Sequence, residues 1–119
     1  MTTTARTVLI TGAASGIGAA AARRLAAPNV QLVLHTRGRA EALQAVAHEC
    51  EARGARTACH LADLGEPGAA AGLVAQALSD FGQLDQVVSN AGKASRAALG
   101  EAGRADFDGA MASMSGAFF

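Results

Sequence analysis

Cysteine is scarce in this chain of 119 residues, and neither sign of charge is in excess. The two cysteines, Cys50 and Cys59, match neither a disulfide framework nor a metal-ligand pattern, so we expect both to be reduced. Ten basic side chains balance ten acidic ones, which argues against nucleic acid or an anionic membrane as the main partner. No apolar run approaches the roughly 20 residues of a membrane span, and residues 1–7 do not have the layout of a signal peptide. These absences predict a cytoplasmic protein of one small domain.

A glycine-rich stretch near the start carries the strongest functional signal. Residues 11–18, TGAASGIG, follow the apolar residues 8–10 and lead into an alanine-rich segment. This order predicts a strand, a tight turn and a helix start, where glycines let backbone N–H groups approach a ligand. The free N–H groups and the dipole of a helix start favour a diphosphate there. The spacing G-x-x-x-G-x-G differs from the general dinucleotide fingerprint, and a purely structural turn stays the alternative at this point.

Apolar strands and amphipathic helices alternate along the chain. We predict strands over residues 7–11, 30–35, 56–61 and 84–89. Helices are predicted from the glycine-rich turn up to Pro28, over 39–53, over 66–81, and from Arg104 to the last residue given, with a loop over 92–103. One apolar stripe is Ile17, Ala21 and Leu25, and the next is Leu43, Val46 and Ala47. Pro67 is expected in the first turn of the third helix, and Gly54 and Gly82 are expected to end the second and third helices.

Strand–helix alternation predicts an α/β fold. A parallel sheet covered by helices on both faces would be doubly wound in three layers, with strand order 3-2-1-4. The winding reverses between the first and fourth strands, and a crevice forms there at their carboxyl ends. Residues 11–18 end the first strand, and Asn90-Ala91-Gly92 end the fourth. Both motifs are therefore expected at one crevice.

In these motifs the chain resembles the short-chain dehydrogenase/reductase family. The match consists of TGAASGIG at 11–18, Asp63-Leu64 after the third predicted strand, and Asn90-Ala91-Gly92 after the fourth. The resemblance implies a Rossmann-type fold and a nicotinamide dinucleotide. It places Gly12, Ser15, Gly16, Ile17 and Gly18 around the diphosphate and riboses. It places Asp63 at the adenine amino group with Leu64 against the ring, and Asn90, Ala91 and Gly92 near a ribose. Asp63 as a helix cap, and Asn90-Ala91-Gly92 as a plain turn, are the alternatives.

The end of the second predicted strand favours NADP(H) over NAD(H). NAD users of the family place a carboxylate where this chain has Thr36, and Arg37 follows. An arginine attracts the 2′-phosphate of NADP that a carboxylate would repel. An Arg–phosphate contact contributes roughly 1.5–3 kcal/mol, or about ten- to a hundredfold in affinity. Arg37 as a solvated loop charge is the alternative.

The chain departs from the family in its catalytic residues. Members use a Tyr and a Lys for proton transfer, with a Ser upstream, whereas this chain has no Tyr and its only Lys is Lys93. A further family Asn would align with Ser113, and Ser89 replaces the first Asn of the usual N-N-A-G. We therefore expect residues 1–119 to be a cofactor-binding domain cut within its fourth helix and inactive alone. The alternative is a complete module that binds a dinucleotide or a partner without catalysis.

The sequence also predicts the kinds of partner and the places of the three histidines. The resemblance implies a small carbonyl or alcohol substrate, whose identity cannot be read, and a homo-oligomer. The balanced charge and the lack of a long apolar run argue against nucleic acid and membrane as partners. The three histidines form no triad or metal set. We expect His48 on a helix surface, His60 at a strand end and His35 near the cofactor.

Overall fold

Four strands and three helices alternate along residues 5–90, the part of the chain that the computed structural model describes. The elements are β1 (Arg6–Ile10), α1 (Gly16–Leu25), β2 (Val30–Thr36), α2 (Ala40–Ala52), β3 (Arg56–Leu61), α3 (Ala69–Phe81) and β4 (Gln86–Val88). The loop 92–103 and the helix from Arg104 expected from the sequence lie outside the described residues.

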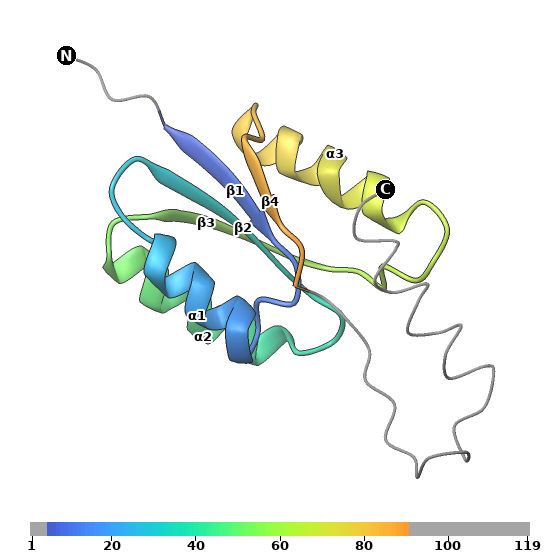
Figure 1. Cartoon of the computed structure of the whole chain (residues 1–119), viewed down its shortest axis with the longest axis horizontal. Coiled ribbons are helices and arrows are strands. Elements are labelled where there is room, and N and C mark those ends of the chain that lie inside the picture. The colour runs from blue at the N-terminus through green and yellow to red at the C-terminus, as the bar shows by residue number, and fades with distance from the viewer. Residues whose placement is uncertain (1–4, 91–119) are drawn as a thin grey trace, which may run out of the picture.

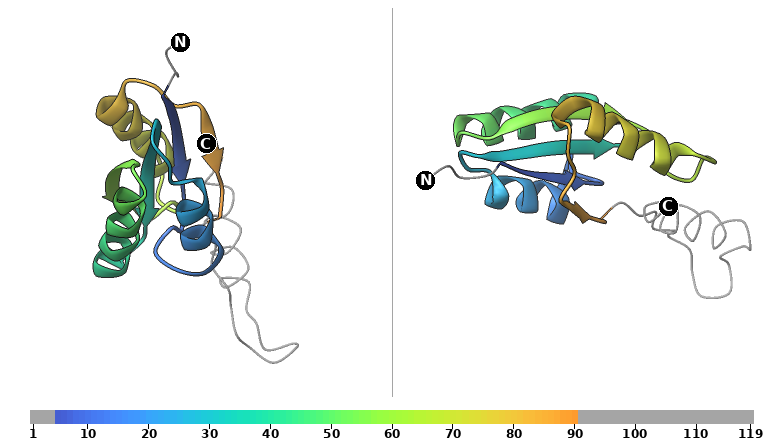
Figure 2. Two further views of the ribbon diagram at one scale, coloured as in Figure 1. Left: turned by 90° about the vertical axis from the view of Figure 1, so that its left-hand side faces the viewer. Right: turned by 90° about the horizontal axis from the view of Figure 1, so that it is seen from above.

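The strands form one parallel sheet in the order β3-β2-β1-β4, which confirms the predicted topology. Helices α1 and α2 lie on one face of the sheet and α3 on the other (Figures 1 and 2). The chain therefore passes from one face to the other between β3 and β4, and the winding reverses between β1 and β4. The carboxyl ends of these two strands mark the switch point at which open α/β sheets bind ligands.

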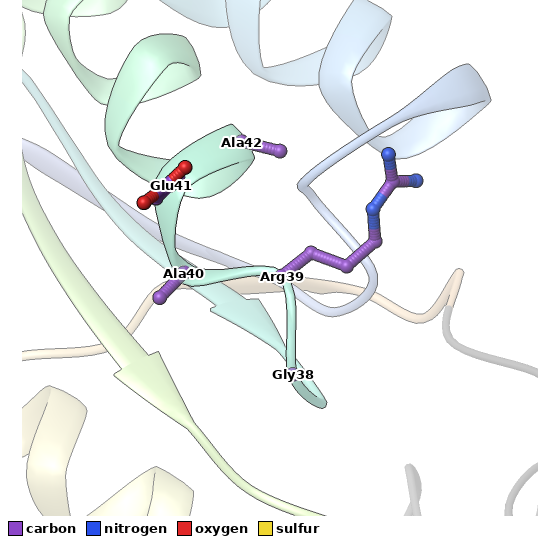
Figure 3. A pocket seen from close by; sticks show the side chains of 5 residues that line it. All are labelled: Gly38, Arg39, Ala40, Glu41 and Ala42. Atoms are coloured by element: carbon purple, nitrogen blue, oxygen red, sulfur yellow. The ribbon is translucent and has the colours of Figure 1, made fainter.

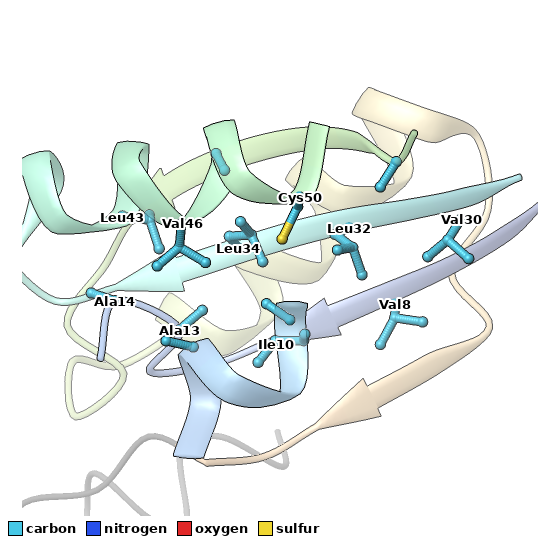
Figure 4. Close-up of a cluster of buried hydrophobic side chains, with 14 residues drawn as sticks. Val8, Ile10, Ala13, Ala14, Val30, Leu32, Leu34, Leu43, Val46 and Cys50 are labelled. Atoms are coloured by element: carbon cyan, nitrogen blue, oxygen red, sulfur yellow. The ribbon is translucent and has the colours of Figure 1, made fainter. Parts of the chain in front are cut away.

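The larger part of the core lies between the sheet and the pair α1 and α2 (Figure 4). Alternate residues of β2 point to opposite faces, so Leu32 and Leu34 pack under these helices while Val33 packs toward α3. Leu43 and Val46 of α2 are almost fully buried, which confirms the predicted stripe of that helix. Each fully buried side chain of this size stabilises the fold by about 1.5–3 kcal/mol, which fixes the register of the strands.

The predicted apolar stripe of α1 is wrong at Ile17, whereas Leu25 at the other end of the stripe packs against the core. Ile17 is 78% exposed, and the buried residues of this helix are Gly18, Ala19 and Ala22. The helix begins beside the turn that precedes it, and only small side chains fit into that contact. The large apolar residue of the first turn, Ile17, is therefore on the open side of the helix rather than in the core.

Helix α3 begins later than predicted. Its N-cap is Gly68 in the left-handed conformation (φ +79°), so Pro67 precedes the helix instead of occupying its first turn. Turn hydrogen bonds from Glu66 N–H to Asp63 O and from Ala69 N–H to Glu66 O occupy this segment. The predicted ends at Gly54 and Gly82 are confirmed, since both glycines directly follow or cap their helices.

Candidate functional site

The turn between β1 and α1, residues 11–18, is called the glycine loop below. Gly12 and Gly16 have φ values of +63° and +58°, in the region that side-chain-bearing residues rarely adopt. Ser15 is the N-cap of α1 in an extended conformation, without a side-chain capping hydrogen bond. The N–H groups of the first helical turn have no partner within the helix and point, with the positive end of its dipole, out of the helix start.

Gly18 is required by close packing rather than by its backbone conformation. A Cβ atom placed there would lie 2.1 Å from the carbonyl oxygen of Gly12 and 2.7 Å from Nδ2 of Asn90. The start of α1 therefore lies directly against the beginning of its own loop. This contact leaves the outer side of the loop as the place where backbone amides can meet a ligand.

Asn90 joins the end of β4 to the glycine loop. Its backbone N–H donates to Oγ1 of Thr11 over 2.9 Å, and its side-chain amide donates to Gly12 O over 3.1 Å. Thr11 N–H in turn donates to Val88 O over 3.1 Å. The two motifs expected at one crevice are thus in direct contact. Ala91 and Gly92, the other members of the second motif, lie outside the described residues.

The end of β2 brings two arginines beside this edge of the sheet. Thr36 is buried, while the Arg37 side chain is 69% exposed. Arg39 is the N-cap of α2 and, with Gly38, Ala40, Glu41 and Ala42, lines an open pocket (Figure 3). In Figure 3 the Arg39 side chain extends away from the first turn of α2. Because Thr36 carries no carboxylate, the first charged side chains after β2 are the basic Arg37 and Arg39, and the first acidic one is Glu41.

Asp63 lies across from Arg37, after β3. Its Oδ2 is 3.5 Å from the Arg37 guanidinium, and its Oδ1 accepts the Gly65 N–H over 3.0 Å. The N-cap of α3 is Gly68, so Asp63 is not the helix cap that was its alternative role. Leu64, which the family resemblance places against an adenine ring, is 4% exposed and packs with Leu9 and Val33 under α3. Its contact with a ligand stays a prediction.

His35, which is expected near the cofactor from the sequence, has a structural role that the sequence alone did not reveal. Its ring is 2% exposed and bonds the glycine loop on one side and the segment after β3 on the other. Burial lowers the pKa of His35 below its ordinary value of 6.5, and His60 lowers it further, while the bond to Ala62 opposes these effects. The available signal was a polar ring directly after the apolar run of residues 32–34. As expected, His48 is exposed; His60 lies one residue before the end of β3 and pairs with Asp80.

Residues 5–90 contain neither a metal-binding cluster nor a membrane-spanning helix. No group of three or more His, Cys, Asp or Glu side chains there could hold a metal ion. No helix in the same range is long and apolar enough to cross a bilayer.

Both Cys50 and Cys59 are free thiols whose pKa is raised, chiefly by burial. Ser113 lies outside the described residues.

The chain is similar to many oxidoreductases. It is 39% identical over 103 residues to (2S)-[(R)-hydroxy(phenyl)methyl]succinyl-CoA dehydrogenase subunit BbsD of Thauera aromatica, covering 87% of this chain and 41% of that protein. Versicolorin reductase 1 of Aspergillus parasiticus is 37% identical over 103 residues, covering 87% and 39%.

Solved structures of dehydrogenases also superpose closely on this chain. A short chain dehydrogenase from Burkholderia cenocepacia in complex with NADP superposes with a TM-score of 0.84 at 32% identity, covering 97% of this chain and 50% of that one. A dehydrogenase/reductase from Sinorhizobium meliloti gives 0.88 at 34% identity, covering 98% and 48%. The chain thus spans about half the length of the relatives it matches. The sequence profile described as short chain dehydrogenase matches residues 6–119, and the chain belongs to the short-chain dehydrogenase family.

Proposed function

We propose that this chain is the coenzyme-binding part of an NADP(H)-dependent oxidoreductase. The enzyme would transfer hydride between the nicotinamide and a carbonyl or alcohol substrate. The observation that carries the proposal is the contact between the glycine loop and Asn90 at the carboxyl ends of β1 and β4. The NADP named with the Burkholderia cenocepacia relative supports the same class of ligand.

The geometry of the loop fits a diphosphate. Gly12 and Gly16 hold the loop in left-handed conformations, and a Cβ at residue 18 would fill the space that the turn needs. The N–H groups of the first turn of α1 have no partner within the helix. The amides of Gly16, Ile17 and Gly18 and the hydroxyl of Ser15 would bind the phosphate oxygens. A bound nicotinamide coenzyme supplies the hydride chemistry, and the protein supplies position and charge.

Arg37 supports NADP(H) as the preferred coenzyme. Its exposed guanidinium stands at the end of β2, where the adenosine ribose of a dinucleotide lies in this class of fold. Thr36 offers no carboxylate to bind a free 2′-hydroxyl. The ion pair with Asp63 is long and half-exposed, so it competes weakly with a phosphate dianion for Arg37.

This chain lacks the Tyr and Lys pair that members of the family use to transfer a proton to the substrate. The sequence contains no Tyr, and Lys93 is its only Lys. We therefore propose that the chain alone binds coenzyme without turnover. The alternative, a non-catalytic dinucleotide-binding module, predicts the same binding, and the two are separated by carbonyl reduction in the protein from its natural source.

The test is calorimetric titration with NADP⁺ and with NAD⁺, in the wild type and in Arg37→Ala. The loss of a charge-assisted contact should weaken NADP⁺ binding by about ten- to a hundredfold and leave NAD⁺ within about twofold. Arg24→Ala is the matched control, since it removes the same charge from the last turn of α1, far from the carboxyl ends of the strands. An unchanged ratio of the two affinities in Arg37→Ala would contradict the preference.

A further inference from the structure

His35 is a polar side chain in the most buried strand of the sheet. It lies one residue before the end of β2, and its ring points to the same face as Val33, toward α3. Only 2% of the residue is exposed, so its ring nitrogens must find their partners within the protein. Its neighbours along the strand, Leu34 and Thr36, are also buried, so the ring lies in the interior of the protein.

The two partners of the ring determine where its proton lies. The backbone N–H of Gly12 donates to Nδ1 over 3.2 Å, so Nδ1 is an acceptor and carries no proton. Nε2 is 2.8 Å from the carbonyl oxygen of Ala62, which can only accept, so Nε2 carries the proton. The hydrogen-bond network thus assigns the neutral ring with its proton on Nε2.

These bonds connect two parts of the proposed coenzyme site. Gly12 is the first glycine of the loop, and Ala62 directly precedes Asp63. The carbonyl oxygen of His35 also accepts the N–H of Ala13 over 2.8 Å. One residue of β2 therefore fixes two consecutive amides of the glycine loop and, through its ring, the start of the segment after β3.

We propose that His35 is a positioning residue: its neutral ring holds the glycine loop in the coenzyme-binding conformation, and protonation of Nδ1 releases it. The inference rests on the proposed function, because the loop is taken to bind a diphosphate. A proton on Nδ1 would face the N–H of Gly12, donor against donor, and the bond would be lost. Coenzyme affinity should therefore fall in acid, although a positive charge on the ring would by itself attract the diphosphate.

Other titratable and charged groups lie on the elements around the ring, and the test must distinguish their effect on the pH dependence from that of His35. His60 lies beside it on β3, in register with His35, and binds Asp80 of α3 over 2.6 Å. The loops next to the ring carry Arg37, Asp63 and Glu66. The experiment therefore compares substitutions of His35 itself, with all these groups left in place.

Replacing His35 with asparagine or with glutamine separates the hydrogen bond at Nδ1 from the one at Nε2. In His35→Asn the side-chain oxygen can occupy the position of Nδ1 and accept from Gly12, and it does not titrate. In His35→Gln the longer side chain reaches the position of Nε2 and Ala62 but offers no acceptor at Nδ1. His48→Gln is the control, because His48 is exposed on α2 and bonds neither loop.

NADP⁺ affinity is measured by calorimetry from about pH 8 down to about pH 5, across the ordinary histidine range. We expect His35→Gln to bind about two- to tenfold more weakly than the wild type at about pH 8, and His35→Asn to bind as the wild type does. Toward low pH the wild type should weaken relative to His35→Asn. The titration of the coenzyme's own phosphate is the same for both proteins and cancels in the comparison.

Amide hydrogen exchange of Gly12 in the free protein provides a readout that needs no coenzyme. Protection should persist in His35→Asn and in His48→Gln and be lost in His35→Gln. Equal protection in both His35 variants, or parallel pH curves for the wild type and His35→Asn, would overturn the positioning role while coenzyme binding stands. Failure of the wild type to bind at about pH 8 would overturn the proposed function, and the role of His35 in coenzyme binding with it.

Discussion

Replacing Gly18 with alanine tests the closest backbone contact in the site. The added Cβ would lie 2.1 Å from Gly12 O, whereas ordinary contact begins near 3.4 Å. The obstacle is a backbone carbonyl, so the turn or the helix start must move by about an ångström. The same movement breaks the 3.1 Å bond from Asn90 Nδ2 to Gly12 O.

The expected loss of stability follows from three contributions. Overpacking costs about 1–3 kcal/mol. Loss of the Asn90 bond adds about 0.5–1.5 kcal/mol. The better helix propensity of alanine returns up to about 1 kcal/mol. Taken together, these terms predict that Gly18→Ala lowers the free energy of unfolding by about 0.5–4.5 kcal/mol. Loss of one charge-assisted amide–phosphate contact should also weaken NADP⁺ binding by about ten- to a hundredfold.

Gly72→Ala provides the matched control. Gly72 lies within α3, and a Cβ there would meet no atom within 4 Å. The same substitution should therefore raise the free energy of unfolding by about 0.5–1 kcal/mol. Urea unfolding and calorimetric titration of both variants make the comparison. Equal stability and equal NADP⁺ affinity in Gly18→Ala and the wild type would refute the packing argument.

Three further predictions concern charge and protons. Asp63→Asn frees Arg37 and removes a negative charge near the proposed phosphate, so calorimetry should show the NADP⁺ to NAD⁺ affinity ratio rising by up to about fivefold; a fall would count against the arrangement. Asp85→Ala leaves the buried Thr7 N–H, now bound over 2.8 Å, without its carboxylate partner, and urea unfolding should show a loss of about 1–3 kcal/mol; no loss would contradict this. Because burial lowers the pKa of His35 below its unfolded value of 6.5, the unfolded chain binds more protons in acid. The stability that His35 contributes should be complete above about pH 6.5 and lost as pH falls through its folded-state pKa, so unfolding free energies of the wild type should decline more steeply in acid than those of His35→Asn.

Periodicity and glycine placement predicted the sheet and its strand order. The parallel strands and the stripe containing Leu43 and Val46 follow from burial alone, which sequence periodicity reports directly. The meeting of the glycine loop with Asn90 followed from topology, because both motifs end neighbouring strands. These features depend on one dominant effect, the burial of apolar side chains.

Other features depend on contacts that no pattern encodes. The exposure of Ile17 results from the close approach of α1 to its own turn, which a helical stripe does not register. The late start of α3 results from the left-handed Gly68, since Pro67 alone would suit a first turn equally well. The two bonds of His35 join residues that lie more than twenty positions away from it in the chain and depend on ring orientation.

The proposed function depends on backbone amides of the glycine loop binding the diphosphate of a nicotinamide coenzyme. The most direct measurement is an amide NMR titration of isotope-labelled protein with NADP⁺. Saturable shifts should be largest at Gly16, Ile17 and Gly18 and should also appear at Asn90. Absence of saturable shifts at about millimolar coenzyme, or largest shifts on α3 at the opposite face, would contradict it.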